Sequence, residues 1–115
     1  MLKGSEKQVR YAEDIKKAML ESLKELEEAL KEVTFKKETT REKSENRIAE
    51  LKEVLSNYEN AADIIEEHKE FLDLNKASRL SHLTKEYKIS AKTLSIAQAK
   101  YADEDGIVTL TEHFW

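Results

Sequence analysis

The sequence of 115 residues contains no cysteine, no proline and only two glycines. Without cysteine, the chain can form neither a disulfide scaffold nor a zinc site built on thiolates. At average usage a chain of this length would carry about eight glycines and six prolines, so segments rich in tight turns are nearly absent. A β-sandwich needs more turn residues than these, and long helices are therefore the expected structure.

Long apolar runs are also missing, since none exceeds four residues. A membrane-spanning helix needs about 20 apolar residues, and residues 1–5 do not resemble a secretory signal. We therefore expect a cytoplasmic protein without a membrane partner. Hydrophobic residues make up 39% of the chain, which is enough for one modest domain over residues 1–115.

An amphipathic pattern over residues 5–33 predicts a first long helix. Ser5 and Gln8 have the spacing of a capping box, which satisfies free backbone N–H groups at a helix start. Apolar residues then recur at steps of three and four, and from Met19 onward these steps alternate strictly, as in a coiled-coil seam. This first stripe consists of Val9, Ala12, Ile15, Met19, Leu23, Leu26, Leu30 and Val33.

A second stripe predicts a helix over residues 40–73, which would lie antiparallel to the first in a long helical hairpin. Thr39 and Glu42 have capping-box spacing at its start. A break near residues 56–60 stays open, because Asn60 could cap a new helix, although the heptad phase continues through this segment. The stripe consists of Ile48, Leu51, Leu55, Tyr58, Ala62, Ile65 and Leu72, and it is widened by Ile64, His68 and Phe71.

A two-helix rod would leave part of each stripe exposed. Either the C-terminal third of the chain or a second copy, in a homodimer, must therefore cover it. Two shorter helices are predicted over residues 77–88 and 90–102, and residues 75–101 hold six basic side chains against one acidic. Residues 103–115 are acidic and aromatic, and they are predicted to form a short extended tail. The predicted fold class is all-α.

The short basic helices resemble the helix-turn-helix of bacterial DNA-binding proteins. Apolar residues stand at the matching positions, while Lys88 takes the turn position that is usually glycine and Thr84 takes a position that is usually a smaller residue. The resemblance implies that one set of side chains would face the major groove: Lys92, Thr93, Ser95 and Gln98. It implies that a second set would neutralise phosphates: Arg79, Lys85 and Lys88. The alternative is an ordinary helical pair that covers the end of the rod.

The acidic tail resembles the calcium loop of an EF-hand, with Asp103, Asp105 and Glu112 at matching positions. Tyr101, however, occupies the first ligand position, which is normally aspartate. We therefore expect no metal site. The expected structure is a helix that ends at Gly106, followed by a short extended segment.

Large aromatic residues close the sequence at Phe114 and Trp115. Aromatic side chains supply much of the energy of interface hot spots. These two residues either fold back onto the helices, which is the favoured interpretation, or anchor a partner together with Tyr101.

No catalytic constellation stands out in the sequence. His68, His82 and His113 are widely separated, and none has the spacing of a metalloprotease motif. No glycine-rich loop is present that could hold a phosphate group. The sequence therefore predicts a protein that is not an enzyme and that uses neither a cofactor nor a metal ion.

Residues 4–15, GSEKQVRYAEDI, resemble the start of a helical segment in small proteins of phages and mobile elements of Gram-positive bacteria. Residues 60–66, NAADIIE, resemble a later segment of the same group, in which a helix restarts. Small helical proteins of that setting include inhibitors of host defence, such as anti-CRISPR proteins. The resemblance thus implies a protein that inhibits or modulates a larger protein or nucleoprotein complex. A helix-turn-helix regulator that binds DNA through residues 79–98 is the alternative.

Overall fold

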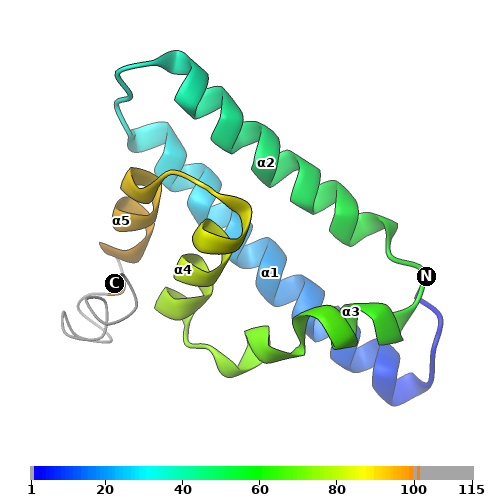
Figure 1. The fold of residues 1–115 in the computed structure, drawn as a ribbon. Coiled ribbons are helices and arrows are strands. Elements are labelled where there is room, and N and C mark those ends of the chain that lie inside the picture. The colour runs from blue at the N-terminus through cyan, green and yellow to red at the C-terminus, as the bar shows by residue number, and fades with distance from the viewer. Residues whose placement is uncertain (1, 100, 102–115) are drawn as a thin grey trace.

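The structure is a computed structural model, and it describes residues 2–99 and 101. Its regular secondary structure within these residues is helical throughout, which confirms the predicted all-α class (Figure 1). The predicted extended tail, residues 103–115, lies outside the described residues. The elements are α1 (Glu6–Glu32), α2 (Glu38–Asn57), α3 (Ala61–His68), the 3-10 helix η1 (Lys69–Asp73), α4 (Lys76–Tyr87) and α5 (Ala91–Ala99).

Helix α1 begins with the predicted capping box. The Gln8 amide donates to Ser5 Oγ at 3.2 Å, and the Ser5 amide donates to Gln8 Oε1 at 3.0 Å. The first stripe is buried from Ala12 to Val33, while Val9 is half-buried at its start. The spacing of the apolar residues therefore places the core-facing side of this helix correctly.

The break near residues 56–60 that the sequence left open does occur, because α2 ends at Asn57 and the chain continues as α3 from Ala61. After the break the buried positions shift by one residue, so that Ala61 and Ile64 are buried while Ala62 is exposed. The predicted cap at Thr39 is wrong, because α2 begins at Glu38 and Thr39 lies within its first turn.

The N-terminal segment explains the break. The Lys3 amide donates to the Glu59 carbonyl at 2.7 Å, and the Ala61 amide donates to the Lys3 carbonyl at 2.8 Å. These bonds occupy backbone groups that a continuous helix would use within itself. Gly4 has a φ of +151°, and a Cβ there would meet the Ala61 methyl at 3.3 Å. The break therefore depends on a contact with a segment far away in the sequence.

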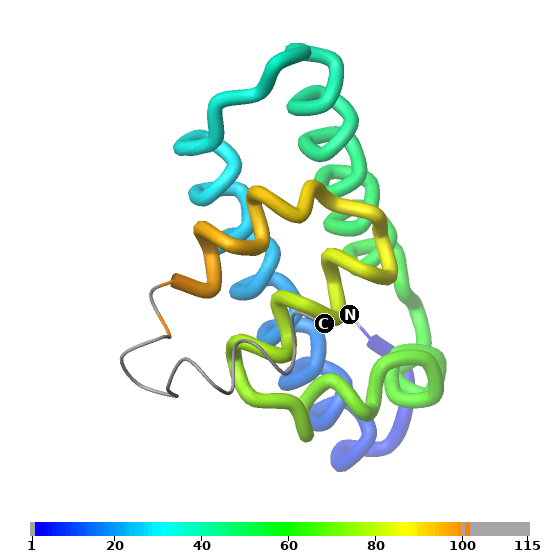
Figure 2. Tube along the Cα trace, turned by 60° about the vertical axis from the view of Figure 1, so that its left-hand side comes forward, coloured from blue at the N-terminus to red at the C-terminus, as the bar shows by residue number. Residues whose placement is uncertain are grey.

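Helix α1 lies at the centre of the molecule. It contacts α2, α3, η1, α4 and α5, and Figure 2 shows α4 and α5 crossing over it. The C-terminal third of the chain thus covers the stripe of α1, as one of the two predicted alternatives required. The buried side chains of all these elements form one continuous hydrophobic cluster.

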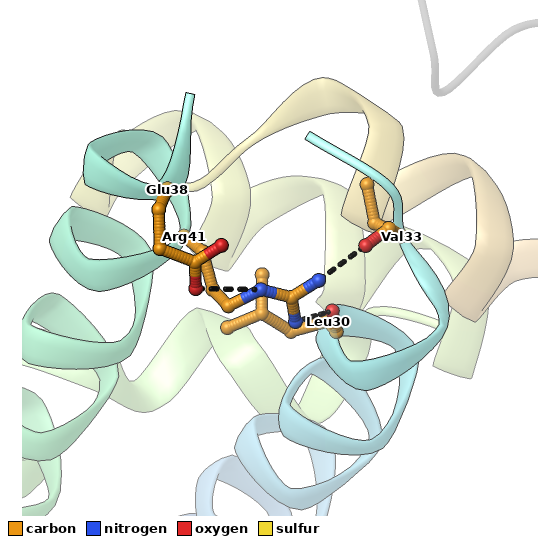
Figure 3. Close-up of polar contacts among 4 residues, drawn as sticks. All are labelled: Leu30, Val33, Glu38 and Arg41. Atoms are coloured by element: carbon orange, nitrogen blue, oxygen red, sulfur yellow. Dashed lines mark hydrogen bonds and ion pairs between the residues drawn. The ribbon is translucent and has the colours of Figure 1, made fainter. Parts of the chain in front are cut away.

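The end of α1 is closed by a side chain of α2 (Figure 3). The guanidinium of Arg41 donates to the Leu30 carbonyl at 2.6 Å and to the Val33 carbonyl, and its Nε lies 3.3 Å from a Glu38 carboxylate oxygen. The same group lies 5.2 Å from the centre of the Phe35 ring. One side chain therefore satisfies the last carbonyls of α1 and fixes the turn into α2.

Replacing Arg41 with alanine is expected to lower the free energy of unfolding by about 1–3 kcal/mol, because two carbonyls lose a charged donor. Urea unfolding followed by circular dichroism measures this loss. The matched control is Arg10→Ala, since Arg10 forms only an exposed pair with Glu6 at 3.8 Å. The control is expected to change stability by less than about 0.5 kcal/mol. Equal effects of the two substitutions would contradict the capping role of Arg41.

Candidate functional site

A groove of about 400 Å³ lies between α2 on one side and the ends of α3 and α4 on the other. It exists because α2 and α4 both pack against α1 but share no extensive contact with each other in the described part of the chain. Its volume falls within the range of sites that hold small ligands or a few side chains of a partner, which begins at about 300 Å³.

The apolar surface of the groove comes from α2 and from two tyrosines. Leu51 is buried, whereas Val54 is 51% exposed and is one of two large exposed hydrophobic residues among those described. The rings of Tyr58 and Tyr87 are half-buried and line the same groove. An exposed aliphatic side chain in a groove that aromatic rings also line is typical of a contact surface.

The polar side of the groove centres on Tyr58. Its hydroxyl donates to a Glu67 carboxylate oxygen and lies 3.3 Å from His68 Nε2, while the tyrosine and histidine rings meet edge to face with their centroids 6.2 Å apart. Burial, followed by the hydrogen bond to Glu67, raises the pKa of the Tyr58 phenol. Tyr58 therefore remains a neutral hydrogen-bond donor at physiological pH.

Two carboxylates act on the same group of side chains. Burial, then the charges of Glu86 and Glu67, raise the pKa of the Tyr87 phenol. Burial lowers the pKa of His68, while the same two carboxylates partly offset this effect. Both carboxylates thus direct a negative field into the groove from the ends of α3 and α4.

The groove is also lined by an arginine of α2, Arg47. Its Nη1 donates to the Lys88 carbonyl at 2.5 Å. Lys88 itself has left-handed backbone angles, φ 55° and ψ 48°, and it ends α4 at the position where a helix-turn-helix usually has glycine. The chain therefore turns after α4 through a left-handed residue that is a lysine, where a glycine would carry no steric cost.

The four side chains predicted to face the DNA major groove do not lie on one exposed surface of α5. Thr93 is 0% exposed and Gln98 is 2% exposed, so the prediction that they face a DNA groove is wrong. Gln98 Nε2 instead donates to the Ala77 carbonyl at 2.8 Å and to Ser81 Oγ at 2.6 Å. Lys92 and Ser95 are exposed, as predicted. Helix α5 buries the side that was assigned to DNA because both α1 and α4 pack on it.

Of the side chains predicted to contact phosphate, Lys85 and Lys88 are exposed. Arg79 is held within the protein. It donates to the carbonyls of Phe71 and Leu72, both at 3.2 Å, and lies over the Phe71 ring. Its guanidinium therefore fixes η1 against α4 and is not available to a phosphate in this structure.

The residues predicted to anchor a partner are Phe114, Trp115 and Tyr101. Phe114 and Trp115 are outside the described residues. Tyr101 is only 6% exposed and its hydroxyl donates to a Glu25 carboxylate oxygen, so the prediction that it anchors a partner is wrong. It belongs to the core beside α1, where an aromatic ring contributes buried apolar area.

The groove itself was missed at the level of sequence. One residue in the sequence could have indicated it. Val54 is apolar, but it does not belong to the stripe of Leu51 and Leu55, so its position on α2 faces solvent. Tyr58, Glu67 and His68 meet because the chain breaks between α2 and α3, and the heptad pattern does not contain that information.

The chain matches no protein-family model, no curated protein and no solved structure. Within residues 2–99 and 101, no group of three or more histidine, aspartate or glutamate side chains is arranged to hold a metal ion. No helix in this part of the chain has the length and apolar character needed to cross a bilayer. Functional inference therefore depends on the residues and their geometry.

The titration of His68 tests the geometry of the groove. Burial lowers its pKa below the ordinary value of 6.5, so protonation favours the unfolded chain and stability is expected to fall as pH decreases through and below that value. An NMR titration of the imidazole Cε1 proton, assigned by its absence in His68→Gln, should give a midpoint below 6.5. A midpoint at or above that value would contradict the burial of His68.

Proposed function

We propose that this protein acts by binding, without catalysis, and that it inhibits or modulates a larger protein or nucleoprotein complex. The groove between α2 and α4 carries the proposal. Val54, an aliphatic side chain open to solvent in a groove that two tyrosines also line, is what a partner side chain would cover. Anchor residues in such pockets supply most of the energy of protein interfaces.

The arrangement of titratable groups supports binding over catalysis. General acid–base catalysis requires a group that exchanges protons near the operating pH. Burial and the hydrogen bond to Glu67 raise the pKa of the Tyr58 phenol further above the physiological range, and His68 Nε2 lies 3.3 Å from the Tyr58 hydroxyl. Both groups instead hold fixed hydrogen-bonding geometry at the wall of the groove.

The resemblance of residues 4–15 and 60–66 to proteins of phages and mobile elements guides the choice of partner. These two segments lie together, since a Cβ at Gly4 would meet the Ala61 methyl at 3.3 Å and α1 packs on α3. Neither segment contains a residue that lines the groove. A nucleoprotein of host defence, such as a CRISPR effector, is the partner that this setting favours.

The DNA-binding alternative receives less support. A recognition helix must present several polar side chains to base edges, and the described exposed face of α5 offers Lys92 and Ser95. A second hollow between α1 and α5 is lined by three carboxylates, those of Glu25, Glu28 and Glu32, and by one lysine, Lys31. Carboxylates at this place would repel the phosphates of a bound duplex.

Val54→Lys is expected to weaken partner binding about tenfold, because it places a charge and a long side chain where the anchor would sit. The immobilised protein is offered purified CRISPR effector nucleases with guide RNA, and the affinity for the retained complex and its DNA cleavage are measured. Ala49→Lys is the matched control, since it adds the same charge to an exposed position of α2 that does not line the groove.

Wild type and Ala49→Lys are expected to retain the same complex and to reduce its cleavage of DNA. Two outcomes would contradict the proposal. One is that no effector is retained or inhibited. The other is that Val54→Lys retains the effector and reduces its DNA cleavage as well as Ala49→Lys does.

A further inference from the structure

The groove has two unlike walls, and together they indicate what kind of side chain it takes. The α2 wall offers the apolar side chains of Leu51 and Val54, together with Arg47 and Glu50. The other carries the carboxylates of Glu67 and Glu86 at the ends of α3 and α4. Tyr58 and Tyr87 line the same groove. A ligand that fits must therefore offer an apolar stem and a cationic head.

The carboxylates of the second wall form no ion pair with the protein's own lysines or arginines. Among the described residues, no lysine or arginine lies within ion-pair distance of Glu67 or Glu86. The nearest approach to Glu67 is His68, at 3.8 Å, and burial disfavours its charged form. Two cations do line the groove, Lys88 and Arg47, and the Arg47 guanidinium is held by the Lys88 carbonyl. Because Glu50 is a third carboxylate of the lining, the groove keeps a small excess of negative charge, which favours an external cation.

Resting on the function proposed above, we propose that the groove receives an arginine side chain of the partner protein, with its stem on Leu51 and Val54 and its guanidinium at Glu67 and Glu86. A planar guanidinium can pair with carboxylates and lie against an aromatic ring at the same time. A lysine ammonium is more strongly hydrated and has no flat face to stack on a tyrosine.

The test uses small probes and NMR spectra of the full-length ¹⁵N-labelled protein at physiological salt. N-acetylarginine amide is titrated against its neutral counterpart, N-acetylcitrulline amide, which has the same stem and a urea head. The arginine probe is expected to shift the amide signals of Val54, Glu67 and Tyr87 in a saturable way. The citrulline probe is expected to bind about fivefold more weakly, because it lacks the charge.

The acidic wall is tested with Glu67→Gln/Glu86→Gln, which is expected to reduce the affinity for the arginine probe about fivefold. Its matched control is Glu42→Gln/Glu45→Gln, which removes two exposed charges of α2 away from the groove. The control is expected to bind the arginine probe as wild type does. Circular dichroism of both double variants confirms that they are folded, so that a loss of binding reports on the groove.

Three outcomes would overturn the arginine assignment. The citrulline probe could bind as well as the arginine probe, or the control pair could lose as much affinity as the groove pair. The groove signals could also shift with protein concentration alone, which would make a second copy of this chain the occupant.

This result is separable from the test of the proposed function. If Val54→Lys abolishes capture of the partner while arginine binds no better than citrulline, the arginine assignment fails and the binding function stands. If arginine binds in the groove while Val54→Lys captures the same partner as Ala49→Lys, the proposed function fails and the recognition of a cation stands.

Discussion

The structure depends on the burial of one long amphipathic helix. Helix α1 is the longest helix in the described part of the chain, and the apolar stripe along it has eight positions from Val9 to Val33; the other helical elements pack on it. Burying a large aliphatic side chain contributes about 1.5–3 kcal/mol, and the row from Ile15 to Leu30 is the surface on which the other elements bury theirs. Helices α3, α4 and α5 are short, and helices of that length are marginal without such packing. Their positions are therefore set by α1.

The groove follows from this arrangement. Three contacts hold α2 to α1 or to the segments that flank α1. Arg41 bonds to the end of α1, and Lys52 forms an ion pair with Glu27 of α1. Just beyond the end of α2, Glu59 pairs with Lys3, which precedes α1. Helix α4 is held on another part of α1. Since both helices are fixed by a third, nothing requires them to close against each other, and the space between them stays open. A binding surface formed in this way is preorganised, which reduces the entropy lost when a partner binds.

The sequence predicted the elements that local rules govern. The cap at Ser5 and the stripe of α1 depend on residues three and four positions apart, and both are confirmed. The break after α2 could not be predicted in full, because the groups that compete with the helix come from Lys3, which lies 56 residues before Glu59. The burial of Thr93 and Gln98 was missed for a related reason. A short helix packed by two neighbours buries more than one face, and its periodicity does not reveal where the second neighbour lies.

Hydrogen exchange, measured residue by residue, tests the central role of α1 most directly. If α1 organises the whole fold, the amides of Leu26 in α1, Leu55 in α2 and Leu83 in α4 should exchange with the same free energy, equal to that of global unfolding. That result would show that both walls of the groove are fixed by the shared core. Amides of α4 that exchange with a far smaller free energy than those of α1 and α2 would contradict the account, because the C-terminal third would then not belong to the core.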